Sequence, residues 1–326
     1  MKKNFKMDLP KNIQLPNEIW LKIMNYLKTK DVFGNFALVC KSFNNLTMDL
    51  EAIKHIHIAN FKTEEDCKRM EKTLQVLKNC YHLRSLSIDE CCTVYMISLA
   101  IQTFQSSPRL KSLKISNCER NWANMDDNRY YHASNTVEKN SHFVEILKQS
   151  AIQLENLELK KACSLSNKEI IKISQIMAPS LKVLKVSVSL MHRIVMTPSE
   201  IDELVPKNNQ IESIHLDFDV SLLRKYTDIM LQYRGALNRL LGKTSKTLKS
   251  IHFPNIDSYP YDNHNRMKEV KLQNLTLCKN LEELVFDLGS HDKQYILGLP
   301  KLKKVGLVQD PTKRLNFIWS SSPYLR

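Results

Sequence analysis

Apolar residues after residue 50 recur in the pattern L-x-x-L-x-[LIVF], which is the strongest periodic signal in the chain. Six strict copies begin at Leu83, Leu110, Leu154, Leu181, Leu272 and Leu281. Looser copies in the same register begin at Ile53, Ile211, Leu248 and Leu302. Random placement of these residues gives about two strict matches, so the excess indicates repeated structure. The copy at Leu272 stands too close to Leu281 to be a separate unit, and we expect it to be helical.

Each unit predicts a short strand, followed in several units by a helix. Polar residues separate the apolar anchors with the alternation of a half-buried strand. Apolar residues then take helical spacing over 65–78 and again over 168–177. The units begin 21 to 44 residues apart, mostly near the roughly 20–29-residue period of leucine-rich repeats. The predicted fold is therefore an α/β solenoid, a horseshoe whose parallel inner sheet of nine strands is about 40 Å long.

The first fifty residues carry shorter apolar stripes that predict three small helices. Pro16 and Glu18 suit the first turn of a helix, because proline needs no hydrogen-bond acceptor there and a carboxylate favours the positive end of the dipole. Ile19, Ile23 and Leu27 then repeat every fourth residue along one face. So small a group of helices cannot bury all its apolar residues alone. This predicts contact with the following domain, with a partner, or with both.

The order of these residues resembles an F-box. The family pattern begins Leu-Pro-x-Glu-Ile, continues along an apolar helix to an acidic residue, and ends in Val-Cys-Lys-x-Trp. The matching positions are Leu15, Pro16, Glu18, Ile19, Ile23, Tyr26, Leu27, Asp31, Leu38, Val39, Cys40 and Lys41. Phe43 replaces the usual tryptophan, and Lys28 replaces a frequent proline. The later units resemble the irregular leucine-rich repeats that follow F-boxes, which implies an N-terminal arm at 1–12, an F-box at 13–50 and a repeat domain at 51–326.

This resemblance implies a non-catalytic substrate-recognition subunit of a Skp–cullin–F-box ubiquitin ligase, in the ubiquitin-like conjugation pathway. The F-box would bind a Skp-type adaptor and, through it, a cullin scaffold, while the repeats would hold an unidentified target protein. The implied adaptor-binding residues are Leu15, Pro16, Glu18, Ile19, Ile23, Leu27, Leu38, Val39, Cys40 and Phe43. Such a subunit works by bringing its target close to the ubiquitin-charged enzyme, so we expect no cofactor. The alternative is an interaction scaffold without ubiquitin transfer.

Polar residues between the apolar anchors predict the target-binding surface. Strand side chains alternate, so these residues share the concave face, together with Val285. The candidates are Ser85, Asp89, Lys114, Glu158, Lys160, Lys185, His215, Asp217, His252, Glu283 and Asp287. The insertion at 119–141 adds Trp122, Tyr130 and Tyr131, although a long loop without a role fits the pattern equally well. For any single position the alternative is a solvated face without a partner.

Two groups on the predicted strands have the residue types of a catalytic or metal site. Ser213, His215 and Asp217 match a triad in composition, but successive outward residues of one strand diverge, whereas a triad needs its histidine between the nucleophile and the carboxylate. We therefore expect no catalysis there. His55 and His57 could hold a metal ion at the sheet edge, yet no third ligand is evident nearby, so surface histidines are the preferred interpretation.

Composition argues against several other classes of function. The six glycines form no G-x-G or G-x-x-x-x-G-K-[ST] pattern, which disfavours nucleotide-dependent enzymes. The eight cysteines include no C-x-x-C pair, which disfavours zinc and, in a reducing compartment, predicts buried thiols. No apolar run approaches the roughly 20 residues that span a bilayer, and no signal-peptide core follows the N-terminus. We therefore expect a protein of the cytoplasm, the nucleus or both, without a membrane segment.

The formal net charge of +14 is unevenly distributed along the chain. Residues 1–50 carry +4, residues 224–249 carry +6 and residues 301–326 carry +5, so the remainder carries −1. The predicted concave register is mixed, with five acidic residues and four lysines. This distribution disfavours the alternative of a nucleic-acid-binding repeat protein, whose footprint is a basic stripe or patch on the binding face. It leaves contact of the basic flanks with an acidic partner as the question to test.

Overall fold

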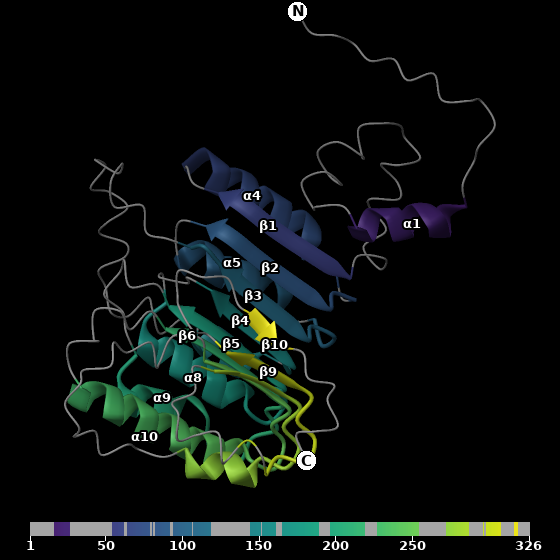
Figure 1. The fold of residues 1–326 in the computed structure, drawn as a ribbon. Coiled ribbons are helices and arrows are strands. Elements are labelled where there is room, and N and C mark those ends of the chain that lie inside the picture. Colours follow the sequence, from purple (N-terminus) through teal and green to yellow (C-terminus); the bar gives the residue numbers. More distant parts are fainter. Residues whose placement is uncertain are drawn as a thin grey trace, which may run out of the picture.

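After one N-terminal helix, strands and helices alternate along the described part of the chain. The computed structural model describes residues 16–26, 54–61, 64–78, 80, 82–91, 94–105, 107–118, 144–150, 152–160, 165–188, 196–218, 227–253, 272–286, 296, 298–307 and 316–318. Helix α1 (Asn17–Tyr26) comes first. In this part of the chain, ten strands form a single sheet (Figure 1).

Nine strands follow the predicted units. They are β1 (His55–Phe61), β2 (Ser85–Cys91), β3 (Ser112–Ser116), β4 (Asn156–Lys160), β5 (Val183–Val188), β6 (Ser213–Phe218), β7 (Ser250–Phe253), β8 (Glu283–Phe286) and β9 (Lys304–Leu307). The helices between them include α4 (Glu64–Leu77), α5 (Val94–Phe104), α8 (Asn167–Met177), α9 (Pro198–Leu204), α10 (Thr227–Thr244) and the 3-10 helix η4 (Gln273–Leu277). Helices α4 and α8 match the helical stretches predicted from the sequence. The predicted α/β solenoid with nine parallel strands is thus confirmed.

Every strand pairs with its neighbour in the sequence, and the repeat pattern lines up across the sheet. The pairs from β1 to β9 are all parallel. Their register aligns the residue two places after the first anchor of each unit, from His55 in β1 to Lys304 in β9. Strand β10 (Asn316–Ile318) differs, because it pairs antiparallel with β9. It lies outside the repeat pattern and was not predicted.

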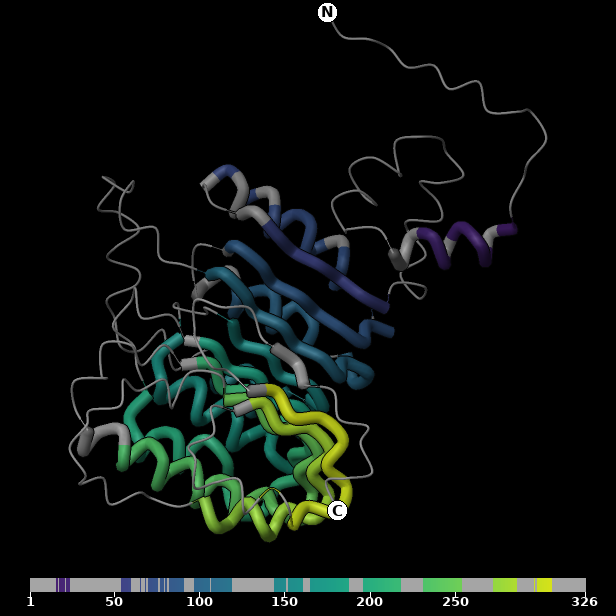
Figure 2. Tube along the Cα trace, viewed as in Figure 1, coloured from purple at the N-terminus to yellow at the C-terminus, as the bar shows by residue number. Residues whose placement is uncertain are grey.

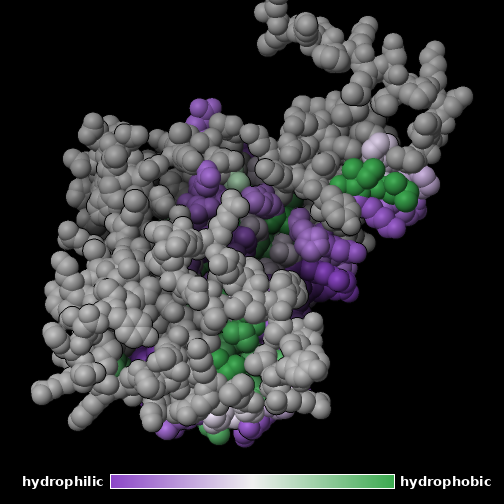
Figure 3. All heavy atoms as spheres, viewed as in Figure 1, coloured by the Kyte–Doolittle hydropathy of each residue, from purple (hydrophilic) through white to green (hydrophobic). Residues whose placement is uncertain are grey.

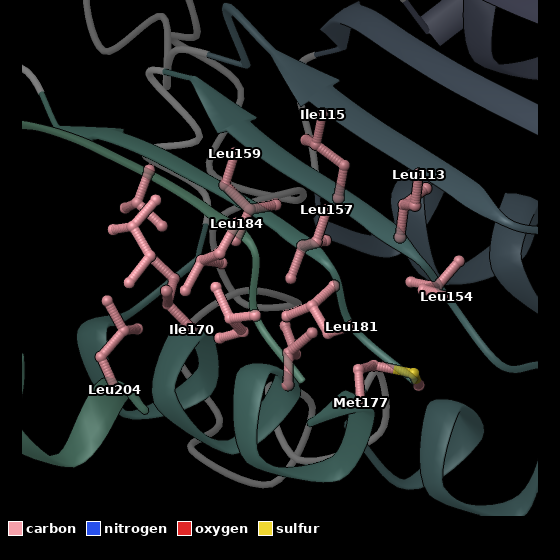
Figure 4. Packing of buried hydrophobic residues seen from close by; sticks show 14 of the residues in the cluster. Leu113, Ile115, Leu154, Leu157, Leu159, Ile170, Met177, Leu181, Leu184 and Leu204 are labelled. Atoms are coloured by element: carbon pink, nitrogen blue, oxygen red, sulfur yellow. The ribbon is translucent and has the colours of Figure 1, made fainter. Parts of the chain in front are cut away.

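The core lies between the sheet and the helices that cover one of its faces (Figure 2). Figure 4 shows Leu157 and Leu184 of adjacent strands together with Ile170 and Met177 of α8 and Leu204 of α9. All five of these side chains are buried. One cluster of buried residues continues along the whole series of units. Each unit therefore covers the apolar face of the next, which is the way a solenoid gains its stability.

A recurring turn fixes the start of each strand. The backbone N–H groups of Arg84 and Ser85 both donate to the carbonyl oxygen of Lys54, over 2.8 and 3.1 Å, and the same pair of bonds recurs in every later unit up to β9. The Ser107 hydroxyl also donates to the Cys80 carbonyl oxygen over 3.1 Å. In later units a different position makes such a bond, because Ser180 and Thr247 donate to the carbonyl oxygens of Leu154 and Ile211, the first anchors of the preceding units. These bonds satisfy buried backbone groups and carry the register from one unit to the next.

Three cysteines of the repeat region are buried thiols. Cys80, Cys118 and Cys278 are unbridged and have almost no solvent exposure. Burial raises the pKa of Cys80 and of Cys278 to about 12, so both stay protonated at neutral pH. A buried, protonated thiol behaves as a small apolar side chain, in agreement with the prediction from the sequence.

Candidate functional site

Helix α1 presents large apolar side chains to the surface. The backbone N–H groups of Ile19 and Trp20 donate to the Pro16 carbonyl oxygen over 3.0 and 3.3 Å, which starts the helix at the predicted proline. Ile19 is 38% exposed, and Trp20 and Ile23 are half-buried. Figure 3 shows hydrophobic atoms on the surface of this helix. One exposed and two half-buried apolar side chains on a single short helix make this surface a candidate for an interaction.

Helix α1 and Pro16, which directly precedes it, contain four of the predicted adaptor-binding residues. Pro16, Glu18 and Ile19 are exposed, and Ile23 is half-buried one helical turn beyond Ile19. The two isoleucines are four residues apart and therefore share one face of the helix. The other predicted members lie outside the described residues: Leu15, Leu27, Leu38, Val39, Cys40 and Phe43.

The concave face brings most of the predicted target-binding residues together in three rows across the strands. The first row includes Ser85 and Glu283. The second row contains Lys114, Glu158, Lys185, His215 and His252. The third row contains Asp89, Lys160 and Asp217. The remaining candidates, Trp122, Tyr130, Tyr131 and Asp287, lie outside the described residues.

A cluster of lysines surrounds Glu158 at the centre of this face. Glu158 Oε1 lies 2.9 Å from Lys114 Nζ, and its Oε2 lies 4.0 Å from Lys185 Nζ. The two lysine side chains remain 43% and 46% exposed. Lys160 follows two residues later on the same strand and is also exposed. Three ammonium groups and one carboxylate leave this part of the face cationic.

Aspartates flank the lysine cluster on both sides. The Ser116 hydroxyl donates to Asp89 Oδ1 over 2.9 Å, and the Ser187 hydroxyl donates to Asp217 Oδ2 over 3.2 Å. Both serines neighbour Lys160 in the third row, so the row has an acidic residue near each end and a lysine in its middle. The face therefore offers both charges in a fixed order, which suits recognition of a polar protein segment.

Histidines and charged residues form a second network on strands β6 to β9. The rings of His215 and His252 stack with their centroids 5.1 Å apart. Burial lowers the pKa of His215, and the positive charge of neighbouring His252 lowers it further. His252 Nε2 lies 3.4 Å from Glu283 Oε2, and Lys304 Nζ contacts the other carboxylate oxygen. Burial alone raises the pKa of Glu283, but hydrogen bonds from Lys304, His252 and Ser250 outweigh it and hold that pKa below its usual value.

His215 does not mediate between the residues of the suspected triad. Its ring stacks on His252, while Asp217 accepts a hydrogen bond from Ser187 on the neighbouring strand. The parallel register places Ser213, His215 and Asp217 in three different rows, each opposite its own neighbour in β5. This geometry agrees with the expected divergence of outward residues along one strand.

One residue of the concave register departs from its predicted exposure. Val285 was expected to face outward, but only 3% of it is exposed. It stands opposite Gly306 in β9, and a Cβ atom at Gly306 would lie 3.1 Å from Val285 Cγ2. Glycine therefore allows the valine to pack closely over the neighbouring strand. An apolar pair replaces the polar surface at this end of the face.

The prediction missed a row of charged residues that precede the strands. This edge row is Lys54, Arg84, Lys111, Glu155, Lys182, Glu212, Lys249, Glu282 and Lys303. Glu155 lies 3.3 Å from Lys111 and 2.9 Å from Lys182, and the later pairs Lys249–Glu212 and Lys303–Glu282 are each separated by 2.8 Å. The signal was available in the sequence, because every member stands one place after the first anchor of its unit.

Other classes of site find no support in the described part of the chain. No group of three or more histidine, cysteine, aspartate or glutamate residues is arranged there to hold a metal ion. None of the helices described has the length and apolar character needed to cross a membrane. The candidate sites are therefore the apolar face of α1 and the polar faces of the sheet.

Comparison with known proteins supports the assignment at the N-terminus. Residues 13–54 match the family described as F-box domain, so the chain carries an F-box domain there. None of the curated proteins matches the chain. Among solved structures it is similar to a chain of the crystal structure of the Rad7 and Elc1 complex in yeast, with 14% identity over 89% of this chain and 87% of that chain. The TM-score is 0.36, and a likeness at this level carries no argument about function.

Proposed function

We propose that this protein is a substrate-recognition subunit of a Skp–cullin–F-box ubiquitin ligase. Its F-box binds a Skp-type adaptor and thereby a cullin scaffold, and its repeats, which we take to be of the leucine-rich type, hold a target protein. The chain contributes no chemistry of its own and accelerates transfer by proximity. It works in the cytoplasm, the nucleus or both.

The observation that carries this proposal is the exposed apolar face of α1 inside a matched F-box segment. Ile19 is 38% exposed, and Ile23 lies on the same face one turn later. Fully burying an exposed isoleucine side chain is worth about 1.5–3 kcal/mol, and covering the part of Ile19 that is still exposed contributes a fraction of that. A partner that covers this face therefore gains binding energy from residues that the rest of the described chain leaves uncovered.

A double substitution on α1 tests the docking step. We expect Pro16→Ala with Ile19→Asp to abolish co-purification with the adaptor, because a carboxylate would be buried in an apolar contact. Lys22→Ala on the same helix is the matched control, since Lys22 is exposed and lies outside the predicted set. If the double variant binds the adaptor as well as the wild type does, the docking assignment is wrong.

The concave face supports the second half of the proposal. Its rows combine lysines, carboxylates and histidines whose geometry is held by cross-strand ion pairs, including Lys114–Glu158 at 2.9 Å. A preorganised polar surface of this kind costs less side-chain entropy on binding than a mobile one. Proximity labelling with and without residues 13–54 should identify proteins that depend on the repeats, and reconstituted ubiquitination of such a protein separates a ligase subunit from a scaffold.

A further inference from the structure

Two of the basic segments meet at the later units of the sheet. Lys246 belongs to the segment 224–249 and Lys301 to the segment 301–326, and each stands in the turn before the first anchor of its unit. The unit between them contributes Lys279 from the same kind of turn. The Asn280 amide group joins these turns, because its Nδ2 donates to the Lys246 carbonyl oxygen and its Oδ1 accepts from Lys301 Nζ, each over 2.8 Å. We call Lys246, Lys279 and Lys301 the turn lysines.

The turn lysines leave a surplus of positive charge. All three are exposed, and no carboxylate in the described part of the chain forms an ion pair with any of them. The neighbouring edge row adds the closed pairs Lys249–Glu212 and Lys303–Glu282, and so adds no net charge. The hydrogen bond from Lys303 lowers the pKa of Glu282, and the charges of Lys249 and Lys301 lower it further, so this carboxylate already faces several cations. Three positive charges therefore remain.

The surplus is confined to the units of β7, β8 and β9. In the units of β4, β5 and β6 the two residues before the first anchor are uncharged, at 152–153, 179–180 and 209–210. The order of the strands places the turn lysines away from β1 and the F-box. Like charges on neighbouring units repel each other, so this cluster does not stabilise the fold through its charges. It raises the local positive potential, which attracts a partner of opposite charge.

An exposed leucine adjoins the turn lysines. Leu277 is the last residue of η4 and is 53% exposed, more than any other large apolar side chain in the described part of the chain. Its carbonyl oxygen accepts from the Lys279 N–H over 2.9 Å, so one tight turn separates the leucine from the lysine. A protein segment can cover this leucine with an apolar side chain of its own, whereas a phosphate backbone gains nothing from it.

We propose that the turn lysines and Leu277 bind an acidic segment of a partner protein that also carries an apolar side chain. Strands lie about 4.8 Å apart, so the three turns span about 10 Å, which about four extended residues can cover. Glu212 and Glu282 lie beside the turn lysines and would repel a uniform polyanion, whereas a protein segment can place neutral side chains opposite them. This contact goes beyond the proposed function, because it requires neither the F-box nor the adaptor.

Fluorescence anisotropy of the full chain with a labelled peptide of glutamates around a central leucine tests the charged half of this inference. We expect Lys246→Glu with Lys279→Glu to weaken binding at least about tenfold at low salt, because two attractive contacts become repulsive. The difference should disappear at about 1 M salt, where the Debye length is only about 3 Å. The matched control is Lys168→Glu with Lys172→Glu, which makes the same change of charge at exposed positions of α8 and should weaken binding less than about twofold.

A second pair of changes tests the leucine. Leu277→Ser should weaken binding of the leucine-containing peptide about threefold, because an apolar contact is lost. The same variant should leave unchanged the binding of a peptide with serine in place of the central leucine, since the interaction needs both partners. If Leu277→Ser weakens the binding of both peptides equally, the assignment of Leu277 to this contact is wrong.

Each outcome decides between the inference and its rivals. Thermal unfolding shows whether the variants fold, and Lys246→Gln with Lys279→Gln provides a milder version whose effect should be about threefold. If this surface variant and the α8 control lose equal affinity, net charge alone explains the binding and the inference is wrong. It is also wrong if the wild type does not bind the glutamate peptide at low salt. If the wild type binds generic duplex DNA or phosphatidylserine vesicles more tightly than the peptide, and Lys246→Glu with Lys279→Glu abolishes that binding, the surface serves a polyanion and the inference is overturned. Co-purification with the adaptor tests the proposed function separately.

Discussion

Isoleucines occupy opposite environments in two regions of this molecule. In the repeat sheet Ile56 is 2% exposed and Ile88 is fully buried, whereas on α1 Ile19 is 38% exposed. The residue type is the same, but the sheet pairs each apolar row with helices that cover it, while α1 presents its apolar face outward. Apolar residues of the sheet therefore stabilise the fold, and those of α1 are available for binding. Substitutions should separate these two roles.

The largest expected effect is on the stability of the sheet. Leu184→Ala should lower the free energy of unfolding by about 2–5 kcal/mol, because this fully buried anchor of β5 leaves a cavity between the strand and the helices. Chemical denaturation of the full chain measures it. Val183→Ala, at the half-buried neighbouring position, is the control and should cost less than half as much. Equal losses for the two variants would contradict the assignment of Leu184 to the core.

The next largest effect is expected on adaptor affinity, with little change in the free energy of unfolding. Ile19→Ala on α1 should weaken adaptor affinity at least about tenfold, which corresponds to about 1.4 kcal/mol, because an apolar anchor is lost from the contact. The free energy of unfolding should change by less than about 0.5 kcal/mol, as for other exposed positions. Calorimetric titration and denaturation on the same samples compare the two quantities. A large loss of stability would place Ile19 in a folded core instead.

A smaller effect is expected at the start of α8. The Ser166 backbone N–H donates to Glu169 Oε2 over 2.8 Å, and the Ser166 hydroxyl accepts from the Glu169 N–H, which forms a capping box. Ser166→Ala should therefore destabilise the fold by about 1 kcal/mol while leaving adaptor affinity unchanged. Ser199→Ala on α9 is an exposed control. A change in adaptor affinity for Ser166→Ala would show that the two regions are coupled.

The smallest effect is a dependence of stability on pH. Burial, followed by the charge of His252, lowers the folded-state pKa of His215 below its ordinary value of 6.5, although Asp217 and Glu158 oppose the shift. A depressed histidine pKa means that the unfolded chain binds the proton more readily than the folded chain. The contribution of His215 to the free energy of unfolding is therefore fully present above pH 6.5 and is lost as the pH falls below it. Thermal unfolding between pH 7.5 and 5.5 should show a steeper decline for the wild type than for His215→Asn. Parallel curves would exclude this contribution.

Much of the fold was predictable because its signals are local. The anchors Leu181, Leu184 and Val186 define strand β5 and its buried face without reference to any other unit, and the same spacing repeated along the chain predicts the parallel sheet. The concave rows follow from the same alternation. On α1, Pro16 and the isoleucine stripe predicted both the start of the helix and its apolar face. The exact domain boundaries and the roles of the candidate residues stay predictions.

What the sequence by itself determined is therefore the set of strands, their buried faces and the N-terminal motif, since each depends on neighbours within a few residues. Only the tertiary structure decided how the units meet. Parallel stacking places Glu155 between Lys111 and Lys182, and it brings the His215 and His252 rings within 5.1 Å of each other. The tertiary structure also buries Val285 against Gly306 and pairs β10 antiparallel with β9 at the end of the sheet. These contacts join residues that are far apart along the chain, so their geometry exists only once each unit of the solenoid has packed against the next.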